Sequence, residues 1–137
     1  MQVVDASVVV AALVDSGPVG QRARERLSDG ECHAPALLDI EVVNVLRTLV
    51  RSGRLDEVNA RRAVRTLPEI PIERSIATAL VTRLWELRHN VTPYDAAYVA
   101  LAERLAAVLV TGDRRLAAAP GARWTCWRSE ATGDDAH

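Results

Sequence analysis

The chain has 137 residues, 49% of them hydrophobic, and this length and composition predict one domain with a single buried core. Its formal net charge of −1 gives no strongly basic balance, which weakens a nucleic-acid role without excluding it. All 17 basic residues are arginine, so a mechanism that needs a lysine, such as a Schiff base or a Walker phosphate contact, is excluded.

The predicted elements alternate between strands and helices along the chain. Val3 and Val4 form a first strand, which leads directly into Asp5 and then into an apolar, buried helix over residues 6–14. Hydrophobic periodicity predicts further helices over residues 19–27, 36–51, 55–67, 75–88 and 92–105. Short strands are predicted at residues 32–34, 70–72 and 107–111 and, on the sheet edge, at 123–127.

Proline and glycine mark several predicted boundaries. Pro35 is expected at a helix start, Gly53 at a helix end and Pro68 directly after a helix. Residues 129–137, SEATGDDAH, are expected to be a polar, disordered tail. Strands that alternate with helices predict an α/β fold, with a mainly parallel sheet covered on both faces and a ligand crevice at the carboxyl ends of its strands.

Two acids directly follow predicted strands. Asp5 ends the segment QVVD, and Asp113 ends the segment VLVTGD. If both strands are central and parallel, the two side chains share one edge of the sheet. Aspartate is also a preferred N-cap, so for each residue alone a capping role stays as open as a functional one.

Two further acids lie on predicted helices. Asp95 stands in TPYD, where Thr92 can serve as N-cap and the pattern is close to a capping box, although its helix is apolar on nearly every side. Glu41 falls at the margin between an apolar and a polar face, where an ion pair with an arginine is the alternative. Asp39 is interpreted as a favourable charge at the helix start.

The order of these acids is more informative than any one of them. An α/β sheet could bring Asp5, Glu41, Asp95 and Asp113 to one end, where their charges repel unless a cation lies among them. Oxygen ligands alone suit Mg²⁺ or Mn²⁺ rather than zinc. One or two such ions could activate a water molecule and stabilise the charge that develops when a phosphodiester is displaced.

The sequence resembles PIN-domain proteins, of the kind found as toxins of VapBC toxin–antitoxin pairs, in MQVVDASVVVAAL, DIEVVNVLR, TPYDAAYVALAE and LVTGDRRLA. The resemblance covers about residues 1–128 and implies a three-layer α/β/α PIN-like nuclease domain. It further implies a Mg²⁺- or Mn²⁺-dependent endoribonuclease whose catalytic and metal-binding residues are Asp5, Glu41, Asp95 and Asp113. An RNA substrate, a cognate antitoxin protein and a homodimer are the partners that it implies.

The resemblance also suggests individual roles. Asp5 and Asp95 are the best-placed direct metal ligands, Asp113 is a second ligand from the opposite strand, and Glu41 is a ligand or orients the attacking water. No further acid follows Asp113 closely, so a fifth ligand seen in some family members has no clear counterpart.

Other polar side chains near these acids have more than one interpretation. Ser7 and Thr111 are expected to hydrogen-bond the carboxylates or metal-bound water, with helix capping equally open for Ser7. Arg114 and Arg115 are interpreted as a solvated helix face rather than as phosphate contacts.

Four remaining residues have no predicted part in the site. Cys32 and Cys126 are isolated and are interpreted as reduced, buried thiols. Trp124 and Trp127 are interpreted as packing of an edge strand rather than as surfaces for base stacking.

Two other functional classes compete with the nuclease. The main alternative is a non-catalytic PIN-like binding or scaffold module, and a receiver domain is excluded by the absence of lysine. No secretion signal or membrane span is visible, which predicts a cytoplasmic protein without a membrane partner.

Overall fold

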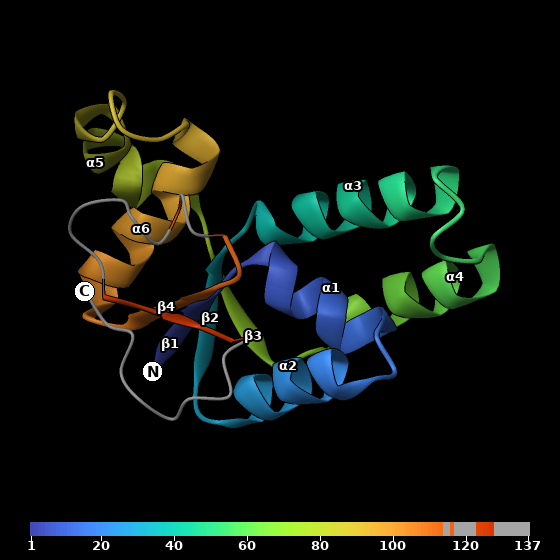
Figure 1. Cartoon of the computed structure of the whole chain (residues 1–137). Helices are drawn as coiled ribbons and strands as arrows, with labels where there is room; N and C mark the ends of the chain where they lie inside the picture. The colour runs from blue at the N-terminus through green and yellow to red at the C-terminus, as the bar shows by residue number, and fades with distance from the viewer. Residues whose placement is uncertain (114–115, 117–122, 128–137) are drawn as a thin grey trace.

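The computed structural model describes residues 1–113, 116 and 123–127, which form an α/β fold around a five-stranded sheet (Figure 1). The strands lie in the order β3-β2-β1-β4-β5, and every pairing between neighbours is parallel. The strands are β1 Gln2–Val4, β2 Cys32–Pro35, β3 Ile72–Ser75, β4 Val108–Thr111 and β5 Trp124–Cys126. As predicted, the last of these is an edge strand.

Helices cover both faces of the sheet, with α1 to α4 on one side and α5 and α6 on the other (Figure 1). The helices are α1 Ala6–Val14, α2 Pro18–Ser28, α3 Leu38–Arg51, α4 Glu57–Thr66, α5 Val81–Glu86 and α6 Pro93–Leu105, with 3₁₀ turns η1 Leu67–Glu69 and η2 Ala77–Leu80. The predicted α/β fold with a parallel central sheet is therefore confirmed. Arg114, Arg115 and the predicted tail, residues 129–137, lie outside the described residues.

The core forms where the sheet meets α1 and α6. Val3 and Val4 of β1 are fully buried, and every residue of α6 from 96 to 102 is buried as well. A strand with helices on both faces has no solvent side, which explains why β1 and β4 are mostly apolar and do not alternate between apolar and polar residues. On the outer layer, α2 packs so closely against the preceding loop that a Cβ on Gly20 would lie 1.8 Å from the carbonyl oxygen of Asp15.

The expected helix start at Pro35 is wrong. Pro35 is the last residue of β2, paired with Ser75 of β3, and α3 begins only at Leu38. The amide of Ala36 donates to the carbonyl oxygen of Ser75 at 2.8 Å, so the chain stays extended past the proline. Contact with a distant strand therefore decides where this helix begins.

The single helix predicted over residues 75–88 is also wrong. Ser75 still belongs to β3, a 3₁₀ turn follows from Ala77 to Leu80, and α5 is only six residues long. The register of β3 against β2 holds residues 72–75 in a strand, and this pairing outweighs local helix preference.

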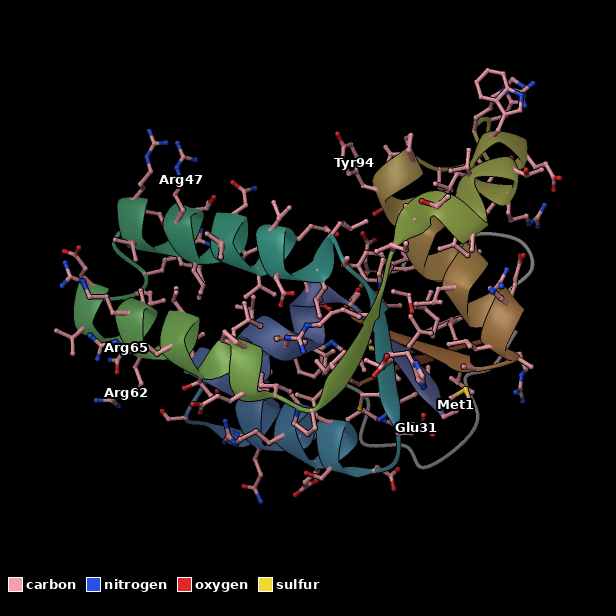
Figure 2. The ribbon with its side chains drawn as sticks, turned by 180° about the vertical axis from the view of Figure 1, so that it is seen from behind. Met1, Glu31, Arg47, Arg62, Arg65 and Tyr94 are labelled. Atoms are coloured by element: carbon pink, nitrogen blue, oxygen red, sulfur yellow. The ribbon has the colours of Figure 1, made fainter. Side chains whose placement is uncertain are left out.

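Polar side chains mark the outer surface of the α3–α4 pair. Figure 2 shows Arg47 projecting from α3, Arg62 and Arg65 projecting from α4, and Tyr94 projecting at the start of α6. These residues are all exposed.

Within the part of the chain that the structure describes, no helix combines the length and the hydrophobicity that crossing a bilayer requires.

Candidate functional site

The four predicted acids lie at the carboxyl edge of the sheet or in helix turns that adjoin it. β1 and β4 are neighbours in register, with Val4 opposite Val110, so Asp5 and Asp113 both follow the ends of central parallel strands. Glu41 and Asp95 lie in the first turns of α3 and α6. These helices begin on the side of the sheet where α1 begins (Figure 1).

Asp5 is the N-cap of α1 and is also the most deeply buried of the four acids. Its Oδ1 accepts hydrogen bonds from the amides of Ser7 at 3.0 Å and Val8 at 3.4 Å, and from the Ser7 hydroxyl at 2.6 Å. Its Oδ2 accepts a short hydrogen bond from the Thr111 hydroxyl. Only 6% of the residue is exposed. The capping role is therefore confirmed. Both backbone amides donate to Oδ1, so Oδ2 takes no part in capping.

The two hydroxyls that hold Asp5 are themselves held by the loop after β4. The amide of Gly112 donates to Ser7 Oγ at 3.0 Å, and the amide of Asp113 donates to Thr111 Oγ1 at 2.9 Å. The expected hydrogen bonds from Ser7 and Thr111 to a carboxylate of the cluster are thus present. They also tie the backbone of Asp113 to Asp5, because Thr111 contacts both residues.

Glu41 is half-buried and carries one strong hydrogen bond. The hydroxyl of Tyr98 donates to its Oε1 at 2.8 Å, across the space between α3 and α6. The tyrosine side chain is almost fully buried, with 1% of the residue exposed. The ion pair considered as an alternative for Glu41 is not found among the described residues.

The charges of the cluster act on one another. Burial raises the pKa of Asp5, and its hydrogen bonds from Ser7 and Thr111 offset only part of that effect. Burial also raises the pKa of Glu41, and the negative charges of Asp95 and Asp5 raise it further. Asp5 and Asp95 are therefore both close enough to Glu41 to repel its charge, and a nearby cation would relieve that repulsion.

Asp95 combines a local role with this electrostatic one. The amide of Asp95 donates to the hydroxyl of Thr92 at 3.2 Å, which confirms Thr92 as the N-cap of α6. The side chain of Asp95 is partly exposed, unlike that of Asp5. Its charge raises the pKa of both Glu41 and Tyr98, so it belongs to the same electrostatic environment.

The donor chemistry of the cluster suits a hard cation. Within residues 1–113, 116 and 123–127, no three acidic, histidine or cysteine side chains are arranged to hold an ion between them. Mg²⁺ does not need such a cage, because it retains several water molecules and is commonly bound through one or two carboxylates and a substrate phosphate. Carboxylate oxygens at one edge of the sheet therefore fit a hydrated divalent cation.

Asp39 does not join the cluster, although it lies only two residues before Glu41. Both of its carboxylate oxygens accept hydrogen bonds from Arg74, at 3.0 and 3.1 Å. Arg74 also donates to the carbonyl oxygens of Leu67, Ile70 and Ile72, so all five of its N–H groups are used. This pair fixes the start of α3 to β3 and the segment before it.

Two residues of the site were not predicted. Tyr98 was recognised only as part of an apolar face, although its position three residues after Asp95 places both on one side of α6. Trp127 was assigned to edge-strand packing. It lies just beyond β5, and its indole Nε1 donates to Ser7 Oγ at 3.1 Å. No sequence signal links residues that are so far apart.

Comparison with known proteins identifies the family. A profile of the PIN domain matches residues 3–122. Ribonuclease VapC1 of Mycobacterium tuberculosis is 48% identical over 120 residues, covering 87% of this chain and 90% of that protein. Ribonuclease VapC9 of the same organism is 42% identical over 116 residues, covering 85% of this chain and 88% of that protein.

A solved structure gives the same fold. The structure of VapBC2 from Rickettsia felis, bound to a DNA fragment from their promoter, superposes with a TM-score of 0.67 at 13% identity and covers 92% of this chain and 98% of the matched chain. The parallel sheet and the match over nearly the whole chain agree with one another. The chain belongs to the PIN domain family.

Proposed function

We propose that this protein is a divalent-cation-dependent endoribonuclease that acts as the toxin of a toxin–antitoxin pair. Its relatives VapC1 and VapC9 are named ribonucleases, and the chain spans most of their length. The observation that carries the proposal is the position of Asp5, Glu41 and Asp95 at helix starts beside the carboxyl edge of the sheet, where the charges of Asp5 and Asp95 repel that of Glu41 and raise its pKa. Such repulsion is costly in a purely structural cluster and is useful in a cation site.

The proposed cation is Mg²⁺ or Mn²⁺, and its ligands come from Asp5, Glu41, Asp95 and Asp113. When bound, such an ion would lower the pKa of a water molecule and stabilise the charge that develops on the phosphate. The protein supplies the positions of the ligands: Ser7 and Thr111 hold Asp5, and Tyr98 holds Glu41. Glu41, Asp95 and Asp113 are partly exposed, whereas Asp5 is buried, so an RNA phosphate with its bound ion reaches these three acids first.

The partners that we propose are RNA, an antitoxin protein and a second copy of the chain. The outer helices leave apolar side chains uncovered: Val58 of α4 is 70% exposed, and Val81 and Trp85 of α5 are 57% and 67% exposed. Apolar stripes of this kind favour association with another protein. Cellular RNA is the proposed substrate, and we therefore retain the cytoplasm as the place of action. The nuclease domain is proposed to extend over residues 1–128.

Cleavage of RNA with and without a chelator tests the activity directly. The purified protein, freed of any partner, is expected to cleave single-stranded or looped RNA with Mg²⁺ or Mn²⁺ and to lose this activity in EDTA. Asp95→Asn should also abolish cleavage, whereas Asp29→Asn, which changes an exposed acid outside the cluster, should leave it intact. Activity that persists in EDTA would rule out the cation.

The alternative of a non-catalytic binding module makes the opposite prediction. It requires that Mn²⁺ neither binds to the acidic cluster nor raises the melting temperature of the wild-type protein. Association is tested separately, by co-expression with the product of the adjacent small gene, which should give a stable complex and relieve growth inhibition. A monodisperse monomer that ignores that product would count against the toxin role.

A further inference from the structure

The hydroxyl of Ser7 makes three hydrogen bonds, which is all that a hydroxyl can make. It donates to Asp5 Oδ1 at 2.6 Å and accepts from the amide of Gly112 at 3.0 Å and from the indole of Trp127 at 3.1 Å. The two accepted bonds come from groups that can only donate. The single hydrogen of the Ser7 hydroxyl is therefore donated to Oδ1 of Asp5.

The two carboxylate oxygens of Asp5 differ in the number of hydrogen bonds that they accept. Oδ1 accepts from two backbone amides and from the Ser7 hydroxyl, which uses its hydrogen-bonding capacity fully. Oδ2 accepts only from Thr111 among the described residues and keeps one lone pair. A cation can therefore approach Asp5 through one oxygen only, and the direction of that lone pair depends on how firmly Oδ1 is held.

We infer that Trp127 is a positioning residue of the acidic cluster, which acts through the Ser7 hydroxyl to orient the Asp5 carboxylate toward a divalent cation. The inference rests on the proposed function, because it assumes that a cation binds there. Trp127 touches neither substrate nor cation in this role. It fixes the direction in which the Ser7 hydroxyl donates its hydrogen, and that hydrogen bond fixes the orientation of the Asp5 carboxylate.

The competing explanation is packing alone, since Trp127 is 2% exposed and fills part of the core. Removing the indole N–H while keeping an aromatic ring separates the two. Trp127→Phe leaves a lone pair of Ser7 without its donor, so the hydroxyl can rotate away from Asp5. Trp124→Phe makes the same chemical change three residues earlier, in β5, and the indole hydrogen bond to Ser7 comes from Trp127. Trp124→Phe is the matched control.

Mn²⁺ binding, measured by electron paramagnetic resonance on partner-free protein, is the main experiment. Ser7→Ala is expected to weaken binding by about 10- to 100-fold, the usual effect of removing a group that orients a ligand. Trp127→Phe should weaken it by about three- to tenfold, the equivalent of one neutral hydrogen bond. Trp124→Phe should bind Mn²⁺ as wild type does.

The double variant decides between positioning and packing. If Trp127 acts through Ser7, Trp127→Phe should have no further effect on Mn²⁺ affinity in the Ser7→Ala background. Additive losses would overturn the inference and assign Trp127 to packing. An unchanged affinity of Trp127→Phe would overturn it as well. Absence of Mn²⁺ binding by the wild-type protein would instead overturn the proposed function on which the inference rests.

A second measurement needs no variant to fold. In the ¹⁵N–¹H spectrum of the wild-type protein, the indole resonance of Trp127 should shift when Mg²⁺ is added, because binding at Asp5 changes the bond that Ser7 receives. The indole resonances of Trp85 and Trp124 serve as internal references in the same spectrum. A Trp127 resonance that moves no more than these two would contradict the coupling.

Discussion

Replacing Asp5 by asparagine separates its two roles, since Asp5 both caps α1 and adds a charge to the acidic cluster. Asparagine keeps an acceptor oxygen for the amides of Ser7 and Val8, so the cap survives. It also removes the buried negative charge of the Asp5 carboxylate. Burial disfavours this charge and therefore raises the pKa of Asp5. Part of this gain is lost where the new amide faces the Thr111 hydroxyl. Without metal at neutral pH, Asp5→Asn should therefore match wild type or exceed it by up to about 1 kcal/mol.

Asp5→Ala should behave differently, because it removes both the cap and the acceptor. Loss of an N-cap costs about 0.5–2 kcal/mol. The hydroxyl of Thr111, which is 1% exposed, also loses its acceptor, and an unsatisfied buried group costs about 1–3 kcal/mol. After the relief of one buried charge is subtracted, Asp5→Ala should lie about 1–4 kcal/mol below wild type. Urea denaturation in EDTA measures both variants.

The effect of Asp5→Asn on cation binding is measured by adding metal. Free ligand at about 100 times its dissociation constant stabilises a native protein by about 2.7 kcal/mol. For a chain of this size that corresponds to a rise of about 10 °C in melting temperature. Wild type should show this rise with Mn²⁺, and Asp5→Asn should show much less and should not cleave RNA. Equal rises in both proteins, with cleavage intact, would refute the reasoning and leave Asp5 as a cap alone.

The pH dependence of stability gives an independent check. The folded-state pKa values of Asp5 and Glu41 lie above their usual values of 3.8 and 4.5. A raised pKa means that the folded protein holds these protons more tightly than the unfolded chain does. The stability that they contribute is complete below about pH 4 and is lost as the pH rises through the folded-state values. Metal-free Asp5→Asn should lose less stability over this range than wild type. An identical loss in both would contradict the raised pKa of Asp5.

Three further variants test other contacts. Tyr98→Phe removes the donor to Glu41 and should weaken Mn²⁺ binding by about three- to tenfold in the same resonance titration; unchanged affinity would show that Glu41 needs no support. Arg74→Lys cannot reproduce five N–H bonds or the paired contact with Asp39, so it should lower the free energy of unfolding by about 1–3 kcal/mol in urea; a wild-type midpoint would contradict this. Gly20→Ala places a Cβ against the carbonyl oxygen of Asp15 and should lower the free energy of unfolding by about 1–3 kcal/mol, measured in a thermal melt. An unchanged melting temperature would show that the loop before α2 can move away without cost.

The sequence could predict that Asp5 and Asp113 lie at one edge of the sheet because their positions follow from local rules. Asp5 and Asp113 follow apolar strands, and parallel strands end at the same edge of a sheet. The helix predicted across residues 75–88 failed for the opposite reason. Pairing of β3 with β2, some forty residues earlier in the chain, holds Ser75 in a strand, and no local pattern carries that information.

The supporting contacts of the site were harder to predict than its acids. Tyr98 lies three residues after Asp95, so its position was readable, but an aromatic residue on an apolar helix is usually core. The contact of Trp127 with Ser7 spans 120 residues and depends on the final placement of β5. Acids that follow strands leave a signal in the sequence, whereas the residues that hydrogen-bond to their partners look like ordinary packing.

The central position of β1 determines when the acidic cluster can assemble during protein synthesis. β1 leaves the ribosome before β4 does, yet it pairs with β4 from residue 108 onward, and Ser7 receives a hydrogen bond from residue 127. Pairing between such distant segments forms slowly and only after both have been made. The nascent chain therefore carries Asp5 without the partners that hold it until residues 108–127 have been made. A ribonuclease built in this way cannot act on RNA near the ribosome before those residues have emerged and folded.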